Sequence, residues 1–165
     1  MTANWGKLKS SGSIHRWFDN KSGKMFMLGK NILSTDTTPE IILNPAGIIT
    51  IRGRSMNENF NELSCEIEEW LDKYFTNPAE VTYVDFCLEY FNKANSKGII
   101  SLLKKIESLV LIKKKYIINW YYEEGDEDIL EKGEYFSSEL NIPFNFIEVY
   151  EALLPEYFSH EKEIP

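Results

Sequence analysis

The sequence predicts a two-layer α/β fold, in which a mixed sheet begins with a hairpin, has parallel core strands and carries helices mainly on one face. Strand-like and helix-like apolar spacings follow one another in the order β-β-α-β-α-β-α-β. Strands that alternate with helices run parallel through right-handed crossovers. The strand predicted over residues 81–91 alternates apolar and polar side chains, whereas a strand covered on both faces is apolar throughout.

The first predicted elements form a β-hairpin. Residues 41–43 and 48–52 are β-type runs, and the turn-forming residues 44–47 between them have the sequence Asn-Pro-Ala-Gly. Residues 1–31 show no sustained period and are predicted to form an N-terminal extension, with a short strand possible near residues 25–28. Residues 32–150 are then the main domain, and 151–165 a C-terminal tail.

The first two helices are predicted from capping and apolar spacing. Asn59 and Glu62 have the spacing of a capping box, and the apolar period that follows is broken at Asn77-Pro78. After the strand at 81–91, residues 92–96 are interpreted as a turn, and residues 95–109 as the second helix.

The remaining elements follow the same logic. Residues 116–122 form a third long strand, and Asp126 caps a third helix. Asn141-Ile142-Pro143 ends that helix, and residues 144–149 form the last strand.

The strand at 81–91 is predicted to have one apolar and one polar face. Residues on alternate positions of a strand point to the same side of the sheet. The apolar set comprises Val84, Phe86, Leu88 and Tyr90, and the opposite set comprises Asp85, Cys87 and Glu89. Burying unpaired carboxylates is costly, so the second face is expected to remain semi-polar.

Composition limits the class of protein. A chain of 165 residues with 43% hydrophobic content is enough for one well-buried core. The net charge of -8 argues against a nucleic-acid partner or an anionic membrane, and the apolar runs are too short for membrane insertion. Two cysteines without metal-like neighbours indicate reduced thiols, and the polar N-terminus lacks a signal peptide, so we expect a cytoplasmic protein.

The passage from the strand at 81–91 into the second helix is the first candidate site. A strand that leads directly into a helix exposes unpaired N–H groups and a partial positive charge. A phosphate on Ser96, in the first turn, would be tolerated there and would add roughly two negative charges to the surface. The alternative is an ordinary helix cap, which Asn and Ser favour anywhere.

The acidic run at residues 123–128 is the second candidate site, since it emerges at the same edge of a parallel sheet. It suits a basic partner, whereas its spacing does not match an EF-hand loop, and the alternative is a solvated turn. Of the aromatic run Trp120-Tyr121-Tyr122, at least two side chains are expected in the core and one as a contact anchor.

The chain is predicted not to be an enzyme and to need no cofactor or metal. His15 and His160 lie in terminal segments that give no rigid placement. Negative neighbours would raise the pKa of the Cys87 thiol. Asp85 and Glu89 could form an acid/base pair, although a polar lining of the sheet is favoured.

Together, the two candidate sites predict one partner-binding surface. Its predicted members are Asn92, Lys93, Asn95, Ser96, Lys97, Tyr121, Tyr122, Glu124 and Asp126.

Four motifs, in this order and spacing, resemble the SiaC family of bacterial regulatory phosphoproteins. The resemblance spans residues 34–149. The motifs are Thr37-Thr38-Pro39-Glu40-Ile41, Leu88-Glu89-Tyr90-Phe91-Asn92 with Ser96-Lys97, Asn119-Trp120-Tyr121-Tyr122 with Asp126-Glu127-Asp128, and Ile142-Pro143-Phe144.

The resemblance implies an anti-anti-sigma (STAS-like) fold and a partner-switching role in cyclic-di-GMP signalling and biofilm control. In such systems a kinase phosphorylates a hydroxyl near the junction, a phosphatase reverses this, and the unmodified protein binds and activates a diguanylate cyclase. Family members carry a Thr directly after the Asn that ends the strand. Here that residue is Lys93, and Ser96 is the remaining hydroxyl of the segment and the candidate for phosphorylation.

Two alternatives remain open on the residues alone. The strand-end crevice could bind a small molecule or nucleotide, although the chain has no glycine loop for phosphates. The semi-polar face could instead make the chain a self-associating scaffold. We expect a monomer or weak homodimer.

Overall fold

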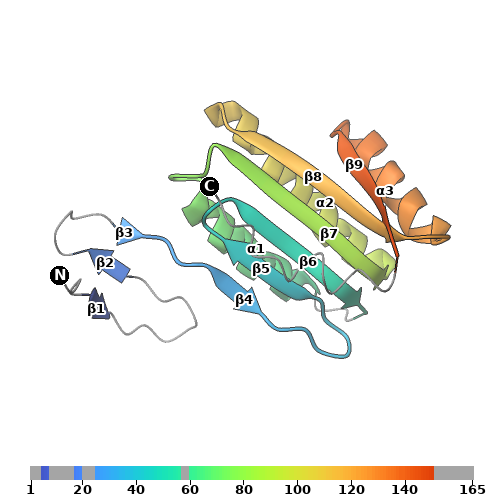
Figure 1. The fold of residues 1–165 in the computed structure, drawn as a ribbon, viewed down its shortest axis with the longest axis horizontal. Helices are drawn as coiled ribbons and strands as arrows, with labels where there is room; N and C mark the ends of the chain where they lie inside the picture. The colour runs from blue at the N-terminus through green and yellow to red at the C-terminus, as the bar shows by residue number, and fades with distance from the viewer. Residues whose placement is uncertain (1–4, 8–16, 20–24, 57–59, 151–165) are drawn as a thin grey trace.

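The structure, a computed structural model, describes residues 5–7, 17–19, 25–56 and 60–150. Figure 1 shows the arrangement of its helices and strands. The elements are β1 (Trp5–Lys7), β2 (Trp17–Asp19), β3 (Met25–Phe26), β4 (Lys30–Ile32), β5 (Glu40–Asn44), β6 (Ile48–Ser55), α1 (Phe60–Tyr74), β7 (Val81–Phe91), α2 (Lys93–Glu107), the 3-10 helix η1 (Ser108–Ile112), β8 (Lys115–Glu123), α3 (Glu127–Leu140) and β9 (Phe144–Val149).

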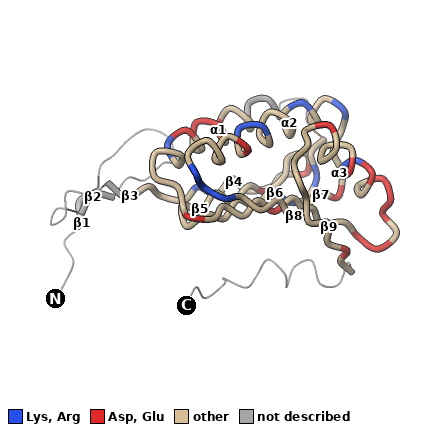
Figure 2. Tube along the Cα trace, turned by 90° about the horizontal axis from the view of Figure 1, so that it is seen from above, with Lys and Arg blue, Asp and Glu red and all other residues tan. Residues whose placement is uncertain are grey.

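The main sheet has the strand order β4-β5-β6-β7-β8-β9. The strands β4, β5 and β6 pair antiparallel, and β6, β7, β8 and β9 pair parallel. Figure 2 shows α1, α2 and α3 together on one side of this sheet. The predicted two-layer α/β class, with its hairpin and parallel core, is therefore confirmed.

The β5–β6 hairpin turns where the sequence predicts it. The Asn44 side-chain oxygen accepts a hydrogen bond from the Ala46 amide (2.9 Å), and the Gly47 amide donates to the Asn44 carbonyl (3.0 Å). Gly47 has a φ of 96°, and a Cβ there would lie 2.6 Å from the Val81 carbonyl oxygen. Glycine is needed at this position both for its backbone conformation and for its size.

The core lies between the sheet and the helices, and Trp120 is its aromatic centre. Trp120 is fully buried, and its indole N–H donates to the Ile129 carbonyl of α3 (2.9 Å). Its ring packs edge-on against Phe91 and Phe136. Gly133 lets α3 approach, because a Cβ there would lie 2.6 Å from the Trp120 ring nitrogen.

The second face of the sheet is semi-polar, as predicted, and none of the described helices covers it (Figure 2). The Asp85 carboxylate accepts a hydrogen bond from the Asn119 side-chain Nδ2 (2.7 Å). The Asn119 side-chain oxygen accepts one from the Asn145 side-chain Nδ2 (3.0 Å). The Asp85 carboxylate therefore has a hydrogen-bond partner at the sheet surface, and it is not buried without one.

The N-terminal strands differ from the prediction. The strand expected near residues 25–28 is β3, and it belongs to a separate antiparallel sheet of order β1-β2-β3. The strand β4 was not predicted, and it pairs with β5 across the predicted domain boundary at residue 32. Its Lys30 Nζ lies 2.5 Å from Glu66 of α1. A three-residue strand is too short to show alternation, so this pairing becomes visible only in the folded sheet.

The prediction that Tyr90 faces the core with Leu88 is wrong. The β6–β7 register shifts between Gly53 and Arg54, which pair with Leu88 and Tyr90, so Glu89 is an extra residue. Such a bulge moves the following side chains to the opposite face. As a result Tyr90 is 42% exposed, and Phe91 is 2% exposed and takes the core position.

The segment 92–96 is not a turn, because α2 already begins at Lys93. A single residue, Asn92, therefore separates β7 from α2. The α-helix ends at Glu107 and continues as η1 to Ile112. The predicted cap Asn59, the histidines His15 and His160, and the tail at 151–165 lie outside the described residues.

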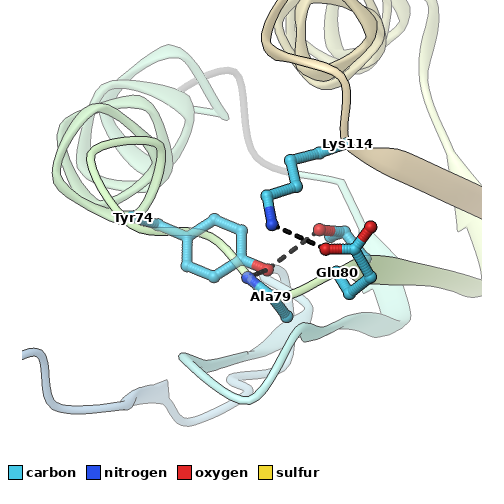
Figure 3. A network of polar contacts seen from close by, with 5 residues as sticks. Tyr74, Ala79, Glu80 and Lys114 are labelled. Atoms are coloured by element: carbon cyan, nitrogen blue, oxygen red, sulfur yellow. Dashed lines mark hydrogen bonds and ion pairs between the residues drawn. The ribbon is translucent and has the colours of Figure 1, made fainter.

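At the edge of the sheet where the parallel strands begin, polar contacts join the loops before β7 and β8 (Figure 3). The Tyr74 hydroxyl accepts a hydrogen bond from the Ala79 amide (3.1 Å) and lies 2.9 Å from the Thr82 hydroxyl. Lys114 Nζ lies 2.8 Å from the Glu80 carboxylate, which lowers the pKa of Glu80 through their hydrogen bond and charge attraction.

Candidate functional site

The candidate site is the opposite edge of the sheet, where the parallel strands end. The strands β7 and β8 are parallel neighbours, and α2 and α3 start directly after them. In Figure 1 these strand ends and helix starts lie at the lower right. Open α/β sheets commonly bind partners and ligands at this edge.

Asn92 fixes the start of α2 to the end of β6. Its side-chain oxygen accepts from the Asn95 amide (3.0 Å), as an N-cap does, and its side-chain N–H donates to the Met56 carbonyl (3.1 Å). Its own backbone N–H donates to the Ser55 carbonyl (3.3 Å). The side chain of Asn92 is therefore largely used in holding the junction together.

The prediction of Asn95 as a partner contact is wrong for this structure. Asn95 is 1% exposed, and its side-chain Nδ2 donates to both the backbone carbonyl and the side-chain hydroxyl of Ser55 (2.6 Å each). The third residue of this helix faces the sheet, since the strand passes into the helix without a loop. Asn95 positions the junction from within.

The exposed residues at the start of α2 are basic. Lys93 and Lys97 are exposed, Ser96 is half-buried, and the first turn contains no acid. A helix N-terminus already carries a partial positive charge, so these lysines make the α2 start more electropositive.

The start of α3 has the opposite charge. Asp126 caps the helix, as predicted, and its carboxylate accepts from the Ile129 amide (3.1 Å). Glu127 and Asp128 follow in the first turn, and Glu124 is exposed in the preceding loop. Figure 2 shows this acidic run at the end of the molecule beyond β8.

A shallow pocket lies beside the α3 start. Its lining includes Cys87, Glu89, Tyr121, Tyr122 and Asp126. Burial, with a further contribution from Glu89, raises the pKa of the Cys87 thiol to about 12. Cys87 is therefore protonated at neutral pH and is a poor nucleophile, in the direction that the sequence predicts.

The aromatic run is divided between the two faces of the sheet. Trp120 is buried, and Tyr122 is half-buried against the same core, so the expectation of two core aromatics is confirmed. Tyr121 lies on the opposite face and lines the pocket. Tyr122 also contributes to the lining of this pocket, so both tyrosines border it.

Three residues at this edge were missed in the sequence. Tyr90 is 42% exposed and Met56 46% exposed. Lys132 of α3 places its Nζ 4.9 Å from the Phe91 ring centre and 5.8 Å from that of Tyr90. The bulge in β7 exposes Tyr90, and the parallel crossover brings Lys132 next to it, so local sequence offers no signal for this group.

The family model described as SiaC family regulatory phosphoprotein matches residues 32–149. The chain belongs to the SiaC family. This SiaC-family chain is 25% identical over 115 residues to an uncharacterised protein of Pseudomonas aeruginosa (strain UCBPP-PA14), a match that covers 69% of the chain and 91% of that protein.

Solved SiaC structures have the same fold. The crystal structure of apo-SiaC from Pseudomonas aeruginosa matches with a TM-score of 0.64 and 24% identity, over 74% of this chain and 98% of that one. A chain in the crystal structure of the diguanylate cyclase SiaD in complex with its activator SiaC, from the same organism, matches with a TM-score of 0.67 and 24% identity. That match covers 73% of this SiaC-family chain and 99% of the other.

Proposed function

We propose that the chain is a non-enzymatic regulatory protein of the cytoplasm that binds and activates a diguanylate cyclase. Membership of the SiaC family carries this proposal, since SiaC of Pseudomonas aeruginosa is the activator of the cyclase SiaD. The match covers almost the whole of the chain found in that complex. The high pKa of Cys87 agrees with a binding role rather than covalent catalysis.

The proposed cyclase-binding surface is the edge where the parallel strands end. It presents the exposed lysines Lys93 and Lys97 beside an acidic α3 start, with Tyr90 and Met56 as apolar contacts. Aromatic and Met side chains are enriched at the centres of interfaces. Neighbouring patches of opposite charge would fix the orientation of the partner.

Control by phosphorylation would differ from the control that the family resemblance implies. Lys93 occupies the position expected to hold the phosphorylated Thr, and it is exposed and has no hydroxyl. We infer that Lys93 holds the chain in the state of the unmodified protein, which is the form that binds the cyclase. Ser96 is half-buried in the first turn and remains the candidate for phosphorylation.

The proposal is tested by adding the purified chain to diguanylate cyclases of its source organism and measuring cyclic di-GMP formation from GTP. The wild type is expected to raise the rate of one of them. Tyr90→Ala should weaken this activation at least about tenfold, since truncating an interface hot spot removes about 2 kcal/mol of binding free energy.

Tyr135→Ala is the matched control, because Tyr135 is 58% exposed on α3 and outside the proposed surface. It should activate like the wild type. If none of the cyclases responds, the proposed function is wrong. If the two tyrosine variants behave alike, the proposed surface is wrong.

The inference on Lys93 is tested with the organism's SiaC-type kinase. Wild type should take up no phosphate on residue 93, and Lys93→Thr should become phosphorylated there and lose activation. Phosphopeptide mass spectrometry would locate the phosphate. A phosphorylated Lys93→Thr that activates as well as the wild type would contradict the inference.

The small-molecule alternative receives little support from the pocket. Glu89 and Asp126 line it, and carboxylates repel the phosphates of a nucleotide.

A further inference from the structure

At the end of the molecule opposite the proposed cyclase-binding surface, three successive apolar side chains are exposed. Val110, Leu111 and Ile112 of η1 are 56%, 84% and 47% exposed. We call these three residues the apolar knuckle. Single exposed apolar residues are common, whereas a contiguous exposed group indicates contact with another molecule or a membrane.

The exposure of the knuckle is fixed by the backbone. Lys113 adopts a left-handed conformation (φ 60°), and its N–H donates to the Val110 carbonyl (3.0 Å). The Lys114 N–H donates to the carbonyl of Leu109 (3.1 Å), whose side chain is fully buried below the knuckle. The knuckle is therefore a capped turn anchored in the core, which holds its apolar side chains outward.

Lysines flank the knuckle in the sequence of a chain that is acidic as a whole. Residues 104–115 contain five lysines and one acid, Glu107, although the chain has a net charge of -8. Two of the five are paired, Lys105 with Asp72 (2.7 Å) and Lys114 with Glu80 (2.8 Å; Figure 3). The remaining three are exposed and make none of the ion pairs found among the described residues: Lys104, Lys113 and Lys115.

We propose that the apolar knuckle docks on the surface of an anionic phospholipid bilayer. The three apolar side chains would enter the interfacial region, and Lys104, Lys113 and Lys115 would meet the anionic head groups. This is peripheral contact, since no helix among the described residues is long and apolar enough to cross a membrane.

Shape and charge favour a bilayer over a protein partner. The most exposed residue, Leu111, projects from the end of a helix, and a projecting apolar tip needs no matching cavity when the other surface is fluid. The net charge of -8 is a sum over the whole chain, and the two ends of the sheet differ in composition. The lysines lie at the start of β8, and the acids of α3 follow its other end, so the nine residues of this strand separate the two groups.

The inference rests on the knuckle and is independent of the proposed cyclase activation. The full chain would be sedimented with vesicles of phosphatidylcholine, with and without about 40% phosphatidylglycerol, at low salt. The wild type should pellet with the anionic vesicles and much less with the neutral ones. Leu111→Asp should lower the vesicle partition coefficient at least about tenfold, because a carboxylate replaces the apolar tip that enters the bilayer.

Leu33→Asp is the matched control, since Leu33 is also highly exposed (73%) but follows β4, outside the knuckle. It should bind vesicles like the wild type, and circular dichroism should show all three proteins folded. Lys113→Gln with Lys115→Gln should remove the preference for anionic vesicles, and added salt should weaken wild-type binding.

Two outcomes would overturn the proposal. The wild type could fail to pellet with anionic vesicles, or Leu111→Asp could pellet as well as the wild type. If the wild type fails to pellet and Leu111→Asp also reduces cyclase activation, the knuckle contacts a protein instead.

Discussion

The starts of α2 and α3 are built alike but carry opposite charges. Each follows a parallel strand, and each is capped by a side-chain oxygen that accepts from the amide three residues later, Asn92 from Asn95 and Asp126 from Ile129. The first turn of α3 contains two acids, as the helix dipole favours. The first turn of α2 has no acid and begins with Lys93, against the dipole.

This difference separates residues that fold the domain from residues available for function. The caps satisfy backbone N–H groups that any helix start leaves open, so they carry fold information. Lys93 makes no such contribution, since a cation next to a helix N-terminus is unfavourable. A surface residue that opposes local stability is a better candidate for partner recognition than one that supports it.

The α2 start depends most strongly for its stability on the buried side chain of Asn95. Asn95→Asp should lower the free energy of unfolding by about 3 kcal/mol, because a buried carboxylate would face the Ser55 carbonyl that now accepts from the amide. Urea unfolding would measure it. Asn77→Asp, the same change at an exposed position, should stay within about 0.5 kcal/mol. Equal losses would mean that Asn95 is not buried as described.

The corresponding support of α3 is the contact between Gly133 and Trp120. Gly133→Ala should lower the free energy of unfolding by about 2 kcal/mol, since its Cβ would lie within 2.7 Å of three Trp120 ring atoms and push α3 outward. Thermal unfolding followed by circular dichroism is the measurement. A stabilised variant, as expected for glycine to alanine in a free helix, would contradict this packing.

The side-chain caps are the feature that the starts of α2 and α3 share. Asn92→Ala and Asp126→Ala should each lower the free energy of unfolding by about 1 kcal/mol, because each leaves a backbone N–H without its acceptor. Urea titrations of both variants would show it. A loss at only one helix would mean that the two starts are not equivalent.

Reversing the charge in the first turn of each helix should change the free energy of unfolding least. Lys93→Glu should raise the free energy of unfolding by about 0.5 kcal/mol, and Asp128→Lys should lower it by about the same amount, since each reverses its interaction with the dipole. Both changes should shrink in high salt. Changes of the same sign would contradict the electrostatic argument.

Much of this edge was predictable because strand alternation and helix caps are local signals. The bounds of β7 and β9 and the Asp126 cap followed from spacing and breaker residues. What the sequence could not show depends on pairing between distant segments. The bulge that exposes Tyr90 exists only against β6, and Asn95 is buried only because the end of β6 passes beneath it.

The same limit applies to the start of the domain. The strand β4 is three residues long, and only its pairing with β5 makes it part of the sheet. Whole-chain charge was also a poor guide, because the lysines near η1 and the acids near α3 cancel in the sum while lying at different ends.

The proposed function requires the start of α2 to contact the cyclase. Isothermal titration calorimetry of the activated cyclase would compare two charge reversals on one helix, Lys93→Glu at its start and Lys104→Glu in its last turn. Lys93→Glu should weaken binding at least about tenfold, or about 1.4 kcal/mol, while Lys104→Glu should bind like the wild type. Equal affinity of Lys93→Glu and the wild type would contradict it.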